Sequence, residues 1–339
     1  MSTTTFSRRH ALGLAALLTG ATTIAACGQD KDSGASAGGE VTEIKVGYIA
    51  DYNGGSLMAI ANDQDLWSKY GLKAELSTFT NGPLQIQALG TKDLDFGYIG
   101  SGAMWLPASG KATVLTLNST SNADRVIARS GITSVKDLAG KKVGVPEGTS
   151  GDLILQLALE KEGMSLEDID KVAMDPTTVV SAFSAGQIDA AGIWYPLLGT
   201  IKEQVPDLVE LAGDEDFKDT MAFPSASVMR TDVDDDTALK MAKVLRDAID
   251  FRAKDQEKTI ELTAALIKAD PATLKADADY ANYYDSSQLQ ELTDDGTIVK
   301  WLNALAEFNV KAGKLTDPAD AAQWYASEIF TQAGQGGAK

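Results

Sequence analysis

Short apolar runs alternate with amphipathic stretches over most of the chain. Such runs are typical of buried strands, and apolar residues at helical spacing behind them predict helices packed on a sheet. Strands are predicted at residues 44–49, 72–79, 94–99, 113–117, 125–128, 142–145 and 188–193. Helices are predicted at 57–70, from Pro83, and at 152–162. This alternation predicts an α/β protein with mostly parallel sheets.

The pattern becomes mainly helical from Thr237 onward. One apolar face there consists of Ala238, Met241, Leu245, Ala248 and Ile249. The acidic run before it, residues 232–236, lacks the glycine and the final glutamate of a calcium-binding loop. The run is therefore predicted to be the capped start of a helix.

One segment of the chain recurs. Residues 88–99 align with residues 182–193, and in both a helix ends in a short turn before a strand that starts near an aspartate, Asp95 or Asp189. The roughly 300 residues after the N-terminal leader also exceed what one hydrophobic core usually holds. Together these features predict two similarly built lobes.

The N-terminus has the layout of a secretory signal peptide. Arg8 and Arg9 precede an apolar stretch, and small residues then lead up to Cys27. The run 24–27 (Ile-Ala-Ala-Cys) resembles the lipobox of bacterial lipoproteins, which implies removal of residues 1–26 and a lipid on Cys27. The alternative is a secreted protein cut after Ala26 with a free thiol. Residues 7–12 also resemble a twin-arginine export signal, so the export route stays open.

The regions next to both ends are polar. Residues 27–40 contain many Gly, Ser and Asp, which predicts a flexible linker, and residues 334–339 are predicted to be a frayed tail. The expected location is therefore outside the cytoplasm, with the lipid as the sole attachment to the cell membrane.

Composition narrows the possible functions. The chain has one Cys, one His and a net charge of −18. Removing residues 1–26 takes away two arginines and the histidine and leaves 28 basic (30 − 2) against 48 acidic residues, a net charge of −20. Histidine-based catalysis, Cys nucleophiles and nearly all zinc sites are then excluded. No catalytic residue, metal or cofactor is predicted, and the negative charge argues against nucleic acid as a partner.

Carboxylate-only catalysis stays as an alternative. It would need a converging pair of acids. Asp51, Glu147 and Asp152 are too ambiguous to be assigned such a role from sequence.

Four segments combine glycine with short polar side chains where a helix should begin after a strand. Ligands of open α/β sheets bind there, beside the free N–H groups of helix starts. Helix starts favour negative charge, so sulfonate, phosphate, nitrate or carboxylate groups are the expected guests. An ordinary capped loop is the alternative for each segment, and none matches a nucleotide-binding fingerprint. The candidate residues are Asn53, Gly54, Gly55, Ser56, Asn81, Gly82, Ser101, Gly102, Thr149, Ser150 and Gly151.

Two further side chains are candidates for ligand contact. Trp194 follows a predicted strand and could cover the apolar part of a ligand, or it could pack in the core. Arg125 could neutralise an anion where the chain crosses between the lobes, or it could be a plain surface arginine.

Several motifs together resemble the extracytoplasmic solute-binding proteins of the nitrate/sulfonate/taurine class of ABC importers. The resemblance spans residues 43 to 311. Its motifs are residues 45–48 (KVGY), 88–89 with 93–97, 137–145 (DLAGKKVGV), 148–150 (GTS), and 185–190 with Trp194 and Pro196.

The resemblance implies a periplasmic-binding-protein-like fold of type II, with two lobes joined by a two-strand hinge. The first lobe would comprise residues 41–122 and 227–333, and the second residues 123–226. The crossings would lie near residues 119–125 and 224–230. Taurine binders of this class commonly carry an acidic residue where this chain has Ser225, which puts taurine itself in doubt.

The resemblance also implies a function. A monomer would capture a small anionic solute by lobe closure and deliver it to a membrane permease with its ATPase. An aliphatic sulfonate is the first candidate, followed by taurine- and nitrate-like anions. The alternatives are a thiamine-pyrimidine, flavin-type or bicarbonate ligand, or a sensor or scavenger role. An enzyme of thiamine-pyrimidine synthesis shares the superfamily fold, but its chemistry needs histidines, so no enzymatic activity is expected.

Overall fold

The computed structural model describes residues 41–335, which lie within one compact unit, Gly39–Lys339. The predictions for the signal peptide, Cys27, the linker and residues 336–339 lie outside the described residues. Within residues 41–335, no helix is long and apolar enough to cross a membrane. Gly334 and Gln335, which were predicted to belong to the frayed tail, lie instead in helix α13.

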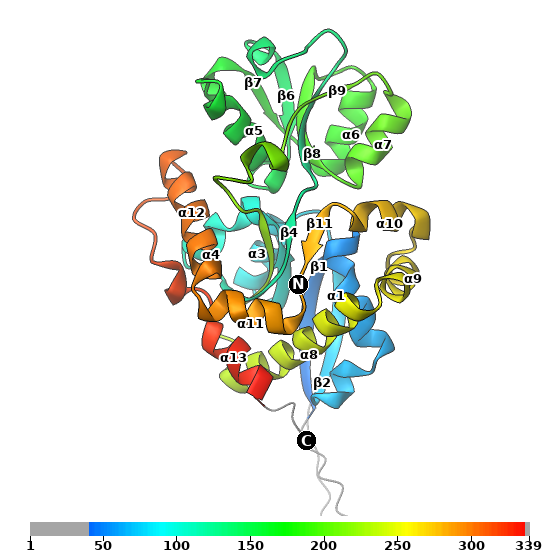
Figure 1. Ribbon diagram of the computed structural model, residues 1–339, viewed down its shortest axis with the longest axis vertical. Coiled ribbons are helices and arrows are strands. Elements are labelled where there is room, and N and C mark those ends of the chain that lie inside the picture. The colour runs from blue at the N-terminus through cyan, green and yellow to red at the C-terminus, as the bar shows by residue number, and fades with distance from the viewer. Residues whose placement is uncertain (1–40, 336–339) are drawn as a thin grey trace, which may run out of the picture. The chain divides into compact units, whose positions relative to one another are not determined.

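Two sheets organise the described chain (Figure 1). The six-stranded sheet has the order β11-β4-β10-β3-β1-β2. Its strands are β1 (Thr42–Ile49), β2 (Leu72–Phe79), β3 (Phe96–Ile99), β4 (Thr113–Ser121), β10 (Pro224–Met229) and β11 (Ala281–Tyr283). The five-stranded sheet has the order β7-β6-β8-β5-β9. Its strands are β5 (Asp124–Ala128), β6 (Lys142–Val145), β7 (Asp170–Ala173), β8 (Ala190–Trp194) and β9 (Val209–Gly213).

Helices flank both sheets. Those of the first part of the chain are α1 (Tyr52–Asp63), α2 (Leu66–Lys69), α3 (Gly82–Gly90) and α4 (Trp105–Ala108). Beside the five-stranded sheet lie α5 (Ser150–Lys161), α6 (Pro176–Ser184) and α7 (Leu197–Gln204) (Figure 1). The later helices are α8 (Asp235–Lys254), α9 (Gln256–Ile267), α10 (Pro271–Ala278), α11 (Ser286–Asp294), α12 (Thr297–Lys311) and α13 (Ser327–Gln335).

The helix starts follow local capping chemistry. Asn81 caps α3 by accepting a hydrogen bond from the Leu84 amide at 3.0 Å, and Pro83 occupies the first turn. Asp234 accepts from the Thr237 amide at 2.9 Å and begins α8, as the acidic run predicted.

Buried apolar side chains fill the space between sheets and helices. The first cluster includes Val46, Phe96, Ile99, Val114, Leu117, Leu245 and Ile249. The second lies under α6 and α7 and includes Val179, Phe183, Ile188, Ile193 and Leu198. The predicted apolar face of α8 (Ala238, Met241, Leu245, Ala248 and Ile249) is buried as expected.

The α/β prediction is confirmed, but the sheets are mixed rather than mostly parallel. β1 pairs in parallel with β2 and β3, and β6 pairs in parallel with β7 and β8. β10 is antiparallel to both β3 and β4, and β5 is antiparallel to both β8 and β9. The reversed strands arise because β5 and β10 each enter their sheet directly from the other sheet, with no crossover helix to restore the direction.

The recurring sequence segment corresponds to a recurring hydrogen-bond pattern. The Asp95 carboxylate accepts from the Lys45 amide at 2.8 Å, and the Asp95 amide donates to the Lys45 carbonyl at 2.9 Å. Asp189 makes the same two bonds to Lys142, at 2.9 and 2.8 Å. Each aspartate therefore fastens the start of a strand to its parallel neighbour, β3 to β1 and β8 to β6.

The chain passes between the sheets through two short segments within residues 41–335. β4 leads into β5 through Asn122 and Ala123, and the chain returns from β9 through the 3₁₀ turn Asp214–Phe217 to β10. The Ser121 amide donates to the Phe223 carbonyl at 2.8 Å, so the two segments lie side by side. The division into lobes at residues 122 and 226 stays a prediction.

Candidate functional site

A small cavity lies where strand ends of both sheets face each other. The volume of this cavity is about 60 Å³. The ends of β1, β3 and β4 and the start of β10 contribute from one sheet, and the start of β5 and the end of β8 from the other. Its lining residues are Ile49, Asp51, Asn53, Asn81, Gly82, Pro83, Tyr98, Gly100, Ser101, Ala103, Ser121, Ala123, Asp124, Thr149, Ser150, Trp194, Tyr195 and Ser225.

The structure brings some of the candidate residues to this cavity and leaves others out. Those that line it are Asn53, Asn81, Gly82, Ser101, Thr149, Ser150 and Trp194. Those that do not line it are Gly54, Gly55, Ser56, Gly102, Gly151 and Arg125.

The first segment is helical rather than a loop. Asp51 accepts a hydrogen bond from the Gly54 amide at 2.6 Å, so α1 begins at Tyr52 and not near Leu57. Gly54 packs on β1, where a Cβ atom would lie 2.5 Å from the Ile49 carbonyl oxygen. Ser56 is fully buried and its Oγ accepts from Arg252 at 3.2 Å. These positions therefore anchor the helix, while Asn53 remains at the cavity.

Gly102 and Gly151 serve close packing. A Cβ atom on Gly102 would lie 1.9 Å from the Thr149 carbonyl oxygen, so the turn after β3 touches the start of α5 backbone to backbone. A Cβ atom on Gly151 would lie 2.6 Å from the Gly192 carbonyl oxygen. Both glycines allow close contact between segments whose neighbouring residues line the cavity, but they do not line it themselves.

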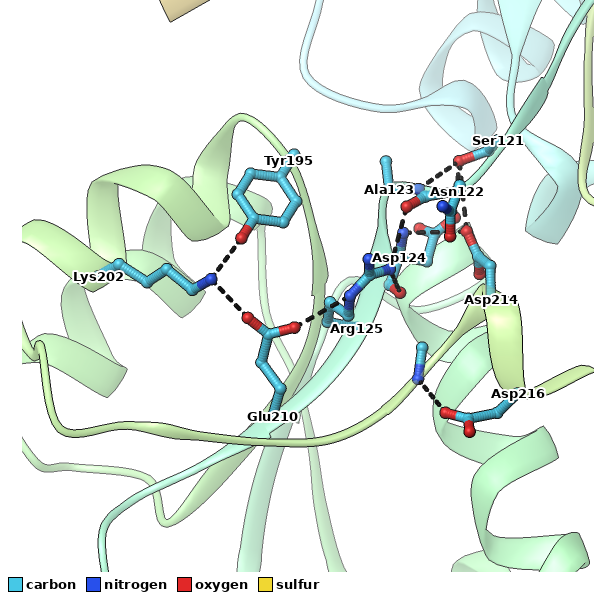
Figure 2. A network of polar contacts seen from close by, with 11 residues as sticks. Ser121, Asn122, Ala123, Asp124, Arg125, Tyr195, Lys202, Glu210, Asp214 and Asp216 are labelled. Atoms are coloured by element: carbon cyan, nitrogen blue, oxygen red, sulfur yellow. Dashed lines mark hydrogen bonds and ion pairs between the residues drawn. The ribbon is translucent and has the colours of Figure 1, made fainter. Parts of the chain in front are cut away.

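Arg125 is engaged away from the cavity. Its Nε donates to Glu210 at 3.0 Å, and its guanidinium also donates to the carbonyls of Asn122 and Asp124 (Figure 2). Lys202 donates to both Glu210 and the Tyr195 hydroxyl (Figure 2). The arginine therefore holds the crossing segment against β9, and its position gives no support for contact with an anion.

Asp51 and Asp124 are the charged residues that line the cavity. None of the lining residues drawn from residues 41–335 is Lys, Arg or His. Burial, with the neighbouring carboxyl of Asp277, raises the pKa of Asp51 to about 8. Burial also raises the pKa of Asp277 to about 6, and its carboxylate accepts from the Tyr52 amide at 2.8 Å.

Asp124 belongs to a second pair of buried acids. Asp214 accepts from the Asp124 amide at 3.1 Å, and the Ser121 hydroxyl donates to Asp124 at 3.3 Å (Figure 2). Burial raises the pKa of Asp124 to about 6, and burial followed by the charge of Asp124 raises the pKa of Asp214 well above its usual range. One oxygen of each carboxyl, Oδ1, has no hydrogen-bond partner among the described residues.

Aromatic and hydroxyl groups complete the cavity wall. Tyr195 stacks on Tyr280 with ring centroids 3.9 Å apart. Trp194 and Tyr98 are buried at the wall, and the Ser101 hydroxyl is buried without a hydrogen-bond partner among the described residues.

Sequence reasoning missed several lining residues. They are Asp51, Tyr98, Ser121, Asp124 and Tyr195. Asp51 stood beside a candidate segment, Asp124 beside Arg125, and Tyr195 beside Trp194, so the end of each predicted strand was a usable signal. Ser225, noted for its place on the returning strand, also lines the cavity and shares a 2.9 Å hydrogen bond with Ser119.

A separate contact ties α5 to the C-terminal part of the chain. Asp152 is fully buried and forms ion pairs of 2.9 Å with Lys171 and 2.8 Å with Lys314. Burial alone would raise the pKa of Asp152, but the charges of Lys314 and Lys171 outweigh it and lower the pKa. Asp152 also accepts from the Gly148 amide at 3.0 Å, which shapes the loop before α5.

The arrangement suits binding of a small molecule with hydrogen-bonding groups. Buried carboxyls, hydroxyls and aromatic rings converge from both sheets on one enclosed space. Within residues 41–335, no group of three or more His, Cys, Asp or Glu side chains could hold a metal ion.

Two mixed sheets flanked by helices, with a polar cavity at their facing strand ends, place this protein among the periplasmic-binding-protein-like α/β folds. The family model described as NMT1/THI5 like matches residues 56–232. The chain belongs to the NMT1/THI5-like family.

Relatives are found among binding proteins. A Brucella abortus (strain 2308) protein, named only as a binding protein, is 50% identical over 291 residues, covering 85% of this chain and 91% of that protein. A Bacillus subtilis (strain 168) protein named as binding aliphatic sulfonates is 26% identical over 256 residues, covering 70% of this chain and 73% of that protein. The resemblance inferred from the sequence motifs is thus confirmed.

Solved structures share the fold. The alkanesulfonate-binding protein SsuA from Xanthomonas axonopodis pv. citri, bound to MOPS, has a TM-score of 0.67 at 22% identity, covering 85% of this chain and 99% of that chain. The nitrate-binding protein NrtA from Synechocystis PCC 6803 has a TM-score of 0.70 at 15% identity, covering 87% and 89%. The desulfurization enzyme DSZB has a TM-score of 0.63 at 14% identity, covering 87% and 99%. Binding proteins and an enzyme therefore use the same fold.

Proposed function

We propose that this protein is the solute-binding component of an ABC importer. It would capture a small solute in the cavity and present it to a membrane permease. Family membership and the binding-protein relatives support this role. The observation that carries it is the cavity itself, whose wall comes from the facing strand ends of both sheets.

The mechanism follows from that wall. A solute that contacts both sheets at once gains affinity only when they face each other closely. It therefore shifts the population toward the closed form by its extra affinity for that form. The two connecting segments beside Ser121 and Phe223 would act as the hinge, with lobes divided at residues 122 and 226.

The setting of this role is also part of the proposal. Relatives named as periplasmic support a place outside the cytoplasm. A lipid on Cys27 would keep the binding protein near its importer and raise its local concentration there. A monomer suffices for this mechanism, because one chain supplies both sides of the cavity.

Sulfonates are the first cargo that the named relatives suggest. The charge of this cavity does not favour them, because Asp51 and Asp124 line it and no described lysine or arginine does. The importer role does not depend on that choice, since closure around a solute requires contact with both sheets and not a particular charge.

A binding assay with matched variants tests the role. The full chain should bind at least one member of a panel of sulfonates, nitrate, amines and amides, with ~2.7 kcal/mol of stabilisation at a hundredfold excess over Kd. Ser101→Ala and Ser150→Ala, at walls from opposite sheets, should each weaken that binding about threefold to tenfold. Ser68→Ala, an exposed serine in α2, is the control and should bind normally. A solute whose affinity responds to only one of the two wall variants would contradict capture between the sheets.

A further inference from the structure

The charges around the cavity are unbalanced. Asp51 at the start of α1 and Asp124 at the start of β5 line it from opposite sheets. Positive groups lie nearby but serve other partners: Arg125 and Lys202 contact Glu210 (Figure 2). Arg252 is buried against Asn118 and Ser56. The charge of Arg125 favours the ionised form of Asp124, but no described lysine or arginine forms an ion pair with either acid at the cavity.

The two acids are buried as well as unbalanced. Asp124 is 1% exposed and Asp51 8% exposed. Asp124 Oδ1 has no hydrogen-bond partner among the described residues, and the Ser101 hydroxyl, which also lines the cavity and is 2% exposed, has none either. A buried polar atom without a partner destabilises the folded protein, because it has lost its hydrogen bonds to water. Such atoms at a cavity wall indicate groups reserved for a bound molecule.

The chemistry of the missing partner follows from these groups. Carboxylates accept hydrogen bonds and attract positive charge. A hydrogen bond between a carboxylate and a positively charged donor is stronger than a hydrogen bond between two neutral groups. Trp194, Tyr195 and Tyr98 add aromatic surface, which attracts cations over its faces. A sulfonate would instead bring a further negative charge to a wall that already carries two carboxyl groups.

We propose that the solute carries a positively charged nitrogen group, which Asp51 contacts from one sheet and Asp124 from the other. The proposal rests on the proposed function and names the chemical class of its cargo. The positive group would donate hydrogen bonds to both carboxyl groups at once, and it would do so only when the two sheets face each other. The charge of the solute would thereby be the element that favours closure.

Three probes of equal chain length test the proposal by calorimetry with the full chain. Propylammonium carries the positive nitrogen, propionamide is a neutral N–H donor, and propanesulfonate is an anion. The unmodified protein should bind propylammonium at least about tenfold more tightly than either other probe, which is the usual margin for a charge-assisted contact.

Single variants then assign the contact. Asp51→Asn and Asp124→Asn should each weaken propylammonium binding by about tenfold to a hundredfold and leave propanesulfonate no weaker. Asp63→Asn removes the same charge at the far, exposed end of α1 and is the control, with unchanged binding of all probes. Circular dichroism and thermal midpoints establish that each variant is folded.

Each result has a defined meaning. Equal binding of propionamide and propylammonium, preferential binding of propanesulfonate, or unchanged propylammonium binding in both cavity variants would overturn the positive-charge proposal. In those cases the importer role would stand, because a solute still binds. Failure of all three probes to bind would overturn the charge proposal, and failure of the wider panel as well would overturn the importer role.

Discussion

Two buried aspartates on the same side of the molecule have opposite surroundings. Asp152 at the start of α5 lies between Lys171 and Lys314, and its pKa is lowered. Asp124 at the start of β5 faces another acid, Asp214, and its pKa is raised to about 6. Both side chains are almost fully buried. Burial alone therefore does not decide the ionisation of an acid, whereas the balance of the charges closest to it does.

The difference separates a structural site from a binding site. Asp152 is balanced in charge, because Lys171 and Lys314 each form an ion pair with it, and Lys314 brings the C-terminal part of the chain to α5. Asp124 lines the cavity, and among the described residues its Oδ1 has neither a lysine beside it nor a hydrogen-bond donor. We therefore assign Asp152 a role in stabilising the fold and Asp124 the proposed role of contacting a positively charged solute.

The largest expected effect is at Asp152. Asp152→Ala removes the shared partner of two largely buried lysines and leaves Lys171 with only the exposed Glu147, so the free energy of unfolding should fall by about 3–5 kcal/mol. Denaturant unfolding measures it, with Asp170→Ala, an exposed aspartate of β7, as the control. A loss below about 1 kcal/mol would mean that the ion pairs of Asp152 with Lys171 and Lys314 do not stabilise the fold.

The next effect, at Asp124, should have the opposite sign. A carboxyl whose pKa is raised from 3.8 to about 6 holds its proton more tightly in the folded protein. Its contribution to stability is present below pH 4 and is lost as the pH rises toward 6. Asp124→Asn removes this loss of stability. At pH 8 the free energy of unfolding of the variant should therefore equal that of the parent or exceed it by about 1–3 kcal/mol. Unfolding curves between pH 4 and 8 measure it. Destabilisation like that of Asp152→Ala would remove the distinction between the two sites.

The smallest expected effect is at Lys314. Lys314→Ala leaves Lys171 to pair with Asp152, so the free energy of unfolding should fall by only about 1 kcal/mol. Lys311→Ala, an exposed lysine at the end of α12, removes the same charge nearby and should change little. A loss as large as that of Asp152→Ala would mean that Lys314 alone balances the buried acid.

The sequence patterns predicted much of the fold for local reasons. β2 and β6 match their predicted ranges, because β2 alternates apolar and polar residues and β6 is a short apolar run, and both patterns are typical of strands. The repeat around Asp95 and Asp189 was visible because each aspartate makes the same backbone contacts in its own sheet. The mixed direction of the strands was not visible, since the hydrophobic pattern of a strand does not depend on which way its neighbour runs.

The candidate site shows the same division. Asn81, Ser101 and Ser150 were found because strand ends and helix starts are readable from local sequence. Gly54 and Ser56 were misplaced because the Asp51 cap starts α1 earlier than its apolar pattern suggests. The two alternatives for Arg125 could not be separated from sequence, because its partner Glu210 is far away along the chain.

By itself the sequence determined the alternation of strands and helices, the repeat and the family. These properties follow from residue order and local spacing. Only the tertiary structure decided that Asp51 and Asp124 share one cavity while Asp152 is neutralised by Lys171 and Lys314. The reason is physical: the free energy of a charge depends on the distance to every other charge and on access to water, and both are properties of the folded chain.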